Sequence, residues 1–209
     1  MKMVKIEREE KKERRLVPPP EQIIFYYPKD DIRKLIEEVY KEKNLKEMKT
    51  GNFERFADYP FMDGLNFYIK KDAFEKMILH SYEMAEEGKE AMGFIIGDVF
   101  YWEKEYTIAF NIITAELDSS SFHVKFKRNA FEKIFDKLDE IEYDYIIVGW
   151  YHSHPGYSSF MSGVDLETQK NYFNKKFHVS LVIDPLNKEA RVFRLINGEC
   201  FEIPYALFK

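Results

Sequence analysis

Residues 148–165 read V-G-W-Y-H-S-H-P-G-Y-S-S-F-M-S-G-V-D, and this stretch decides how the whole chain is interpreted. It holds two histidines, a serine and an aspartate in the pattern H-x-H-x7-S-x2-D, at His152, His154, Ser162 and Asp165. Two imidazoles and one carboxylate commonly bind a catalytic zinc ion, which keeps its fourth coordination position for water or substrate. The pattern therefore indicates a candidate metal site.

The surrounding residues predict how these side chains come together. The run 145–150 is apolar and rich in β-branched and aromatic residues, which predicts a strand, and alternate residues of a strand face the same side. His152 and His154 are expected to extend this strand and to face one way, before Pro155-Gly156 ends it. Asp165 falls at the start of a predicted helix. The end of the strand and the start of the helix can therefore converge on one metal ion.

Two other interpretations stay open from these residues alone. An isolated H-x-H is often structural, so the two histidines need not bind a metal. Ser162-x-x-Asp165 also fits a helix N-cap followed by an acidic N3 residue, which is a weak capping box. Neither alternative explains why the turn, the serine and the aspartate fall at these offsets together.

The flanking residues resemble the motif of the JAMM (MPN+) metalloproteases, and most of all their branch of proteasome-lid deubiquitinases and signalosome deneddylases. The resemblance rests on G-W-Y-H-S-H-P-G-Y at 149–157, S-G-V-D-L-E-T-Q at 162–169 and V-I-D-P at 182–185. The family also has an upstream glutamate in a pattern similar to E-x-x-G-x-x-x-G, which E-A-M-G-F-I-I-G at 90–97 matches. The similarity covers about residues 65–195, and metal-free MPN proteins lack these ligands.

This resemblance implies a fold and a set of roles. The fold class is α/β (α+β mixed), with a curved mixed β-sheet flanked by helices, as in MPN/JAMM and cytidine-deaminase-like proteins. The implied ligands of one Zn²⁺ per chain are His152, His154 and Asp165. Glu90, which spacing alone would leave as a solvated residue after a helix, is implied as the acid–base catalyst. Ser162 is implied as a hydrogen-bond donor to the substrate carbonyl oxygen.

Three aromatic residues near the motif are expected to contact the substrate: Trp150, Tyr157 and Phe160. Trp150 and Tyr151 are expected to line or support the site rather than to react. The sequence departs from the branch at Ser158-Ser159-Phe160, where a glycine-cysteine-tryptophan run is usual, so contacts to the substrate tail are expected to differ.

The resemblance implies a zinc-dependent isopeptidase that removes a ubiquitin-like modifier from lysine. One alternative is a hydrolase that releases a C-terminal amino acid or adduct from a ubiquitin-like sulfur carrier, since its metal site would look the same. A non-catalytic MPN scaffold that binds protein partners is a third possibility. Because the chain ends soon after Leu195, a stand-alone enzyme of archaeal type is expected rather than a subunit of a proteasome lid or signalosome.

Composition limits the class of protein. The 209 residues fit one catalytic domain, expected at 65–209, behind an N-terminal extension of unknown role at 1–64. Apolar residues make up 45% of the chain and its net charge is −5, which argues against disorder and against general nucleic-acid binding. The single cysteine, the lack of a long apolar run and the charged start predict a cytoplasmic protein without a disulfide, membrane span or secretion signal.

Hydrophobic periodicity predicts alternating strands and helices. Helices are expected to start at Asp30, at Asp72 with Glu75 completing a capping box, at Asn129 and at Ser162. Strands are expected at 22–27, 65–69, 90–97, in two segments of 99–114, and at 144–151, 179–183, 190–195 and 200–203. The polar segment 115–126 is either a loop that gates the site or a plain surface loop.

The extension carries four clustered aromatic residues: Phe53, Phe56, Tyr59 and Phe61. They are expected either to pack the extension onto the main domain or to form a surface for a homodimer or a protein partner.

Overall fold

The computed structural model of the chain describes residues 16–49, 59–114 and 145–209. Its elements in chain order are β1 (Ile23–Tyr27), α1 (Ile32–Glu42), β2 (Phe67–Lys70), α2 (Lys71–Glu86), β3 (Met92–Trp102), β4 (Lys104–Thr114), β5 (Ile146–Ser153), α4 (Gly163–Tyr172), β6 (Val179–Asp184), β7 (Glu189–Ile196), β8 (Glu199–Ile203) and β9 (Tyr205–Phe208). No helix in these ranges is both long enough and apolar enough to cross a bilayer.

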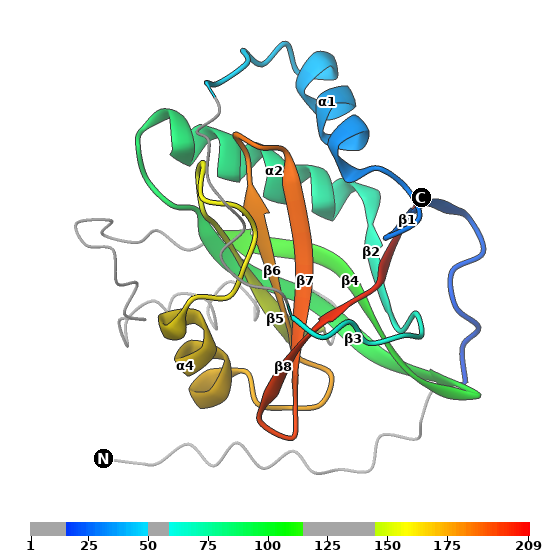
Figure 1. Cartoon of the computed structure of the whole chain (residues 1–209). Helices are drawn as coiled ribbons and strands as arrows, with labels where there is room; N and C mark the ends of the chain where they lie inside the picture. The colour runs from blue at the N-terminus through cyan, green and yellow to red at the C-terminus, as the bar shows by residue number, and fades with distance from the viewer. Residues whose placement is uncertain (1–15, 50–58, 115–144) are drawn as a thin grey trace, which may run out of the picture.

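The strands form one curled mixed sheet in the order β1-β9-β2-β4-β3-β5-β6-β7-β8 (Figure 1). Strand β2 runs parallel to β4 and β9, and β5 runs parallel to β6. The remaining neighbours are antiparallel, and the long β3–β4 pair is a hairpin turning at Glu103, which has a positive φ of 59°. The predicted mixed sheet flanked by helices is confirmed.

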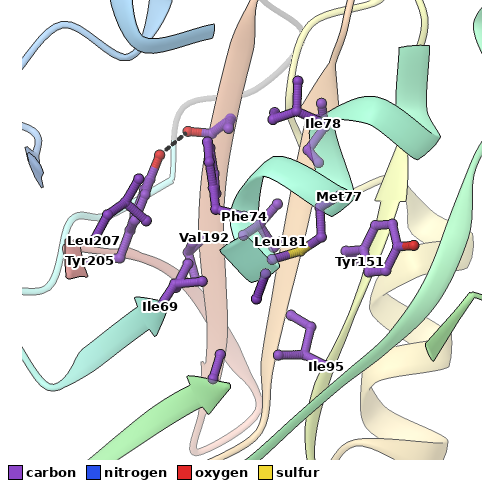
Figure 2. Close-up of a cluster of buried hydrophobic side chains, with 14 of the residues drawn as sticks. Ile69, Phe74, Met77, Ile78, Ile95, Tyr151, Leu181, Val192, Tyr205 and Leu207 are labelled. Carbon is purple, nitrogen blue, oxygen red and sulfur yellow. Dashed lines mark hydrogen bonds between the residues drawn. The ribbon is translucent and has the colours of Figure 1, made fainter. Parts of the chain in front are cut away.

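The two faces of the sheet are covered by different helices. Helix α2 packs Phe74, Met77 and Ile78 onto one face, where they contact apolar residues from the central strands (Figure 2). The opposite face carries a second cluster, in which Trp150 and the α4 C-cap residue Phe173 stack with ring centroids 5.8 Å apart. The sheet therefore separates the α2 core from the face on which α4 starts.

Parts of residues 16–49 and 59–64 pack against this sheet. Strand β1 pairs with β9 at one edge, and α1 adds Ile36, Val39 and Tyr40 to the α2 core. At the opposite edge, residues 60–62 run beside β8. The division into an extension and a catalytic domain at residue 64 stays a prediction.

Two predicted helix starts were wrong. Helix α2 begins at Lys71 with Lys70 as N-cap and without a side-chain cap, so Asp72 lies in the first turn instead of capping it. Helix α1 is capped by Asp31, which accepts from the Arg33 N–H, one residue after the expected Asp30. Asp30 instead accepts a hydrogen bond from the Tyr26 N–H. Strand β9 was not predicted.

Several predictions fall outside the described residues: the helix starting at Asn129, the gating role of 115–126, and the contacts of Phe53 and Phe56. Of the aromatic cluster in the extension, Tyr59 packs on the domain, with its ring centroid 5.0 Å from that of Phe193. The homodimer or partner surface stays a prediction.

Gly93 in β3 marks a close approach of neighbouring strands. A Cβ atom there would lie 2.5 Å from Cε1 of Tyr151 and 2.6 Å from the Ile113 carbonyl oxygen, and the latter is backbone that cannot rotate away. A glycine in the interior of a strand is typical of such a close approach.

Gly93→Ala is therefore expected to lower the free energy of unfolding by about 1–3 kcal/mol, because overpacking forces the strands apart. Urea denaturation followed by circular dichroism measures the change. Gly163→Ala is the matched control, since nothing lies within 4 Å of its added Cβ, and it should not destabilise the protein. Equal stability of Gly93→Ala and wild type would contradict the close approach.

Candidate metal centre

A pocket of about 270 Å³ opens on the sheet face that carries α4. Its walls are Glu90, Met92, Trp150, His152, His154, Tyr157, Phe160, Ser162, Val164, Asp165 and Thr168. The eight residues predicted as metal ligands, catalytic groups or substrate contacts therefore all lie in one pocket, although Glu90 is far in sequence from the other seven, which fall within residues 150–165.

Strand β5 carries the first histidine into the pocket, and His154 follows just after its end. His152 stacks on Trp150, with ring centroids 4.3 Å apart and planes inclined by 13°. The Trp150 indole N–H in turn donates to Oε1 of Gln169 in α4 at 2.6 Å. Since Trp150 is only 1% exposed, it supports the His152 ring from beneath rather than presenting a free surface.

The turn after His154 is held by a buried carboxylate that the sequence did not single out as functional. Asp184, at the end of β6, accepts hydrogen bonds from the backbone N–H groups of Gly156 (2.9 Å) and Ser158 (2.6 Å). It also accepts from two backbone N–H groups and the side-chain amide in its own following turn. Gly156 and Ser158 both have positive φ, 82° and 71°. Asp184 therefore stabilises an unusual backbone path beside the histidines.

Ser158 occupies the position where the resembled branch usually has glycine, and its φ of 71° lies in the left-handed region that favours glycine. Here the Ser158 hydroxyl donates to Oε2 of Glu189 at 2.7 Å, and the Ser159 N–H donates to the same oxygen at 3.2 Å. These bonds offset part of the cost of a non-glycine residue in this conformation.

Helix α4 begins with a full capping box that holds Asp165 in place. Ser162 is the N-cap, its Oγ accepts from the Asp165 N–H at 3.3 Å, and its own N–H donates to Oδ2 of Asp165 at 2.7 Å. The capping interpretation of Ser162-x-x-Asp165 is thus confirmed. It does not compete with a metal site, because the same Asp165 oxygen also faces both histidines.

The geometry of the three side chains suits a zinc ion. Nε2 of His152 and Nε2 of His154 lie 3.4 and 3.5 Å from Oδ2 of Asp165. Ligand atoms about 2.0–2.1 Å from a tetrahedral zinc are ~3.3 Å from each other, so these spacings fit three ligands of one ion better than strong direct hydrogen bonds.

Unpaired buried nitrogens support the same fit. Both ring nitrogens of His152 and Nδ1 of His154 are buried without a hydrogen-bond partner among the described residues. Such atoms are costly to bury unless something else contacts them. Among the described residues, His152, His154 and Asp165 are the one group of metal-ligating side chains close enough to share an ion, with their ligand atoms within 4.8 Å of one another.

Charge in the pocket acts differently on its two carboxylates. Burial tends to raise the pKa of Asp165, but the imidazoles of His152 and His154 beside its Oδ2 outweigh this effect and hold that pKa well below its ordinary value. For Glu90, burial dominates and raises the pKa, with smaller opposing effects of the two histidines. Asp165 is therefore suited to stay a carboxylate, and Glu90 to exchange a proton.

Glu90 reaches the pocket because of strand register. Strands β3 and β5 pair with Met92 opposite His152, and the pairing continues one residue further. There Ser153 donates its N–H to the Ala91 carbonyl at 3.0 Å and accepts the Ala91 N–H on Oγ at 2.7 Å. Glu90 follows directly, beside the histidine edge of the sheet.

The aromatic residues of the motif divide between the two faces. The Phe160 ring centroid lies 4.8 Å from that of His154, and Tyr157 is 44% exposed at the pocket. Tyr151 was expected to line or support the site, but it points into the α2 core (Figure 2) and is hydrogen-bonded to Nδ1 of His80 at 2.8 Å. The alternation of a strand puts it on the face opposite His152.

The sequence interpretation missed Thr168 and Gln169, although both stand in the quoted S-G-V-D-L-E-T-Q run. Their spacing of three and four residues from Asp165 puts them on the same helix face, a signal that could have indicated Thr168 as part of the pocket wall and Gln169 as the partner of Trp150. Asp184 lies in the quoted V-I-D-P run, but no spacing rule connects it with the turn at Gly156.

Comparison with known proteins agrees with this geometry. A profile of the family described as "JAB1/Mov34/MPN/PAD-1 ubiquitin protease" matches residues 63–176. The curated relatives include the 26S proteasome regulatory subunit RPN11 of Eremothecium gossypii, which is 33% identical over 62% of this chain and 43% of the relative.

Two further relatives have similar identity. The ubiquitin carboxyl-terminal hydrolase RPN11 of Saccharomyces cerevisiae is 32% identical over 62% of this chain and 44% of the relative. The COP9 signalosome complex subunit 5 of Debaryomyces hansenii is 32% identical over 58% of this chain and 26% of the relative. The chain thus spans less than half the length of these relatives, but the family profile covers more than half of the chain. This protein belongs to the JAB1/Mov34/MPN/PAD-1 ubiquitin protease family.

Proposed function

We propose that this chain is a zinc-dependent isopeptidase that cleaves the bond between the C-terminus of a ubiquitin-like modifier and a lysine amine, in the cytoplasm. The observation that carries the proposal is the pocket in which His152, His154 and Asp165 converge, with Glu90, two residues before β3, in the same pocket wall. A relative named as a ubiquitin carboxyl-terminal hydrolase supports the substrate class.

The ligands of the proposed zinc are His152, His154 and Asp165. Neutral imidazoles and one carboxylate leave a bound zinc strongly electrophilic, and such an ion polarises a substrate carbonyl and lowers the pKa of water to about 7. The capping box fixes the Asp165 carboxylate, and Trp150 fixes the His152 ring. The chain's own contribution is thus a set of ligands that are oriented before the ion binds.

Glu90 is proposed to move the proton. As the water oxygen bonds to the isopeptide carbonyl carbon, the Glu90 carboxylate accepts a proton from that water. When the C–N bond breaks, Glu90 returns the proton to the departing lysine nitrogen, which leaves as an amine, while the modifier keeps a C-terminal carboxylate.

Ser162 is proposed to stabilise the negative charge that develops on the carbonyl oxygen. A hydroxyl has one proton to donate and two lone pairs that accept. Capping of α4 uses Ser162 Oγ as an acceptor, so donation of its proton to a substrate oxygen is compatible with the cap.

Glu90→Gln should lower kcat about 10²–10⁴-fold with zinc content unchanged, because glutamine keeps the size of the side chain but cannot accept the proton. The measurement is cleavage of a panel of lysine-linked ubiquitin-like conjugates. Glu87→Gln is the matched control, since Glu87 is exposed, pairs with Lys89 at 2.7 Å and should keep wild-type activity.

If Glu90→Gln keeps wild-type activity, the proposed acid–base role is wrong. If the zinc-loaded wild type cleaves no conjugate but hydrolyses a C-terminally extended sulfur-carrier protein, the alternative substrate class replaces the proposed one.

The wild-type chain should bind one zinc ion, whereas His152→Ala should lose most of it, because one of three protein ligands is gone. Equilibrium dialysis with metal analysis measures the stoichiometry, and zinc should also raise the Tm of the wild type, since it binds only the folded site. His80→Ala is the control, because His80 lies on the opposite sheet face against Tyr151. Equal zinc binding by His152→Ala and His80→Ala would rule out the assigned ligands.

A further inference from the structure

Tyr59 lies before the residues that the family profile matches, yet it contacts the backbone next to the proposed catalytic serine. Its phenol hydroxyl donates a hydrogen bond of 2.5 Å to the carbonyl oxygen of Met161, a residue only 3% exposed. Its ring packs edge-on against Phe193 of β7. A side chain from the N-terminal segment thus reaches the loop that leads into α4.

The bonded carbonyl belongs to the same peptide group as the Ser162 N–H. A peptide group is planar and rigid, with its C=O and N–H on opposite sides. Tyr59 holds the oxygen of this group, and Oδ2 of Asp165 holds its N–H at 2.7 Å. Both polar atoms of the Met161–Ser162 peptide are therefore fixed, and this orients the Cα–Cβ bond from which the Ser162 hydroxyl projects.

The backbone beside Tyr59 is itself anchored. The Glu202 N–H donates to the Pro60 carbonyl at 3.0 Å, and the Met62 N–H donates to the Glu202 carbonyl at 2.9 Å. Residues 60–62 thus lie along the β8 edge of the sheet, so Tyr59 projects from a backbone held by two interstrand-type hydrogen bonds.

A second contact reaches the same loop through side chains. Arg191 donates to the Ser159 carbonyl at 3.0 Å and pairs with the Glu202 carboxylate. Tyr27 of β1 donates to the other Glu202 oxygen at 2.5 Å. Hydrogen bonds therefore hold the 159–162 loop at two carbonyl oxygens, that of Met161 and that of Ser159. Tyr59 makes the first bond directly, and Tyr27 supports the second through Glu202 and Arg191.

We propose that Tyr59 is a positioning residue for catalysis, which holds the Met161–Ser162 peptide so that the Ser162 hydroxyl faces the reacting carbonyl oxygen. This inference rests on the proposed function of Ser162. It assigns a role in the reaction to the segment before residue 63. Burial raises the pKa of Tyr59, so its hydroxyl keeps the proton that it donates at neutral pH.

A role of this kind predicts a specific kinetic signature. Ser162 acts on charge that develops in the transition state, so its displacement should lower kcat and leave KM nearly unchanged. Tyr59→Phe removes only the hydroxyl and keeps the ring against Phe193. It should lower kcat about three- to tenfold, the range expected for the loss of one hydrogen bond.

The matched control is Tyr205→Phe. The Tyr205 hydroxyl also donates to a buried backbone carbonyl, that of Ala190 at 3.0 Å, but it lies in the α2 core away from the pocket (Figure 2). Tyr205→Phe should match the stability loss of Tyr59→Phe and keep wild-type kcat. Equal kcat in the two variants, or a raised KM with unchanged kcat in Tyr59→Phe, would overturn the proposal.

A double-mutant cycle tests whether Tyr59 acts through Ser162. In a Ser162→Ala background, Tyr59→Phe should have less than a twofold further effect on kcat, because the group that it positions is gone. Fully additive effects would show that Tyr59 acts by another route and would overturn the proposal.

Amide hydrogen exchange provides a readout that does not depend on activity. In the full chain, the Ser162 and Asp165 amides should exchange several-fold faster in Tyr59→Phe than in Tyr205→Phe, because the peptide loses one of its two restraints. If the wild type cleaves no substrate, the proposed function fails, but this comparison still tests the restraint. Equal exchange in the two variants would overturn it.

Discussion

The register between β3 and β5 is the constraint on which the site depends. Met92 pairs with His152, and the reciprocal bonds between Ala91 and Ser153 continue the ladder to the very end of β5. A one-residue slip would turn the histidines to the opposite face of the sheet and move Glu90 away from them. The close packing at Gly93, next to the Tyr151 ring, is what allows the two strands to approach in this register.

The carboxyl groups in and near the pocket differ in the hydrogen-bond donors and charges that offset the cost of burying them. Asp184 accepts only from neutral donors of two turns, and Glu202 is paired with Arg191 and Tyr27. Asp165 has two imidazoles and a backbone N–H. Among the described residues Glu90 has no comparable set of donors, and burial is the main cause of its raised pKa. Glu90, the carboxyl group with the fewest stabilising partners, is the one proposed to carry a proton. This agrees with the general rule that different environments give the carboxyl groups of one site different pKa values and different roles.

Local sequence signals predicted most of the helices and strands and the H-x-H…D set of the pocket, whereas the curved mixed sheet and the place of Glu90 were predicted only from the family resemblance. Strand β5 and helix α4 have strong local signals, a β-prone run and a capping box, so the positions of His152 and Asp165 followed from them. Helix α2 starts without any side-chain cap, so no residue marks its true start at Lys71. Asp72, a common N-cap residue type, was therefore mistaken for the cap. Strand β9 has only four residues, too few for a periodic pattern to stand out.

What sequence reasoning could not supply are contacts between distant segments. Tyr151 was placed beside the site because it is adjacent to His152 in sequence, whereas the alternation of the strand sends it into the other core. Tyr59 binds a backbone carbonyl 102 residues away, and backbone carbonyls carry no sequence signature. The contacts of Asp184 could not be predicted for the same reason. Most of its partners are main-chain N–H groups, which every non-proline residue has.

The turn clamped by Asp184 also bears on the thermodynamics of ion capture. Binding is weakened by every torsion that must be frozen when the ligand arrives. Here the backbone from Gly156 to Ser158 is already fixed by a carboxylate inside the folded sheet, in conformations that a free chain rarely visits. The conformational entropy of this turn is therefore lost when the domain folds and not when a metal ion binds. If His152, His154 and Asp165 bind an ion as proposed, that ion would meet a nearly rigid chelator, and its release would require ligand bonds to break but would not require the turn to unfold.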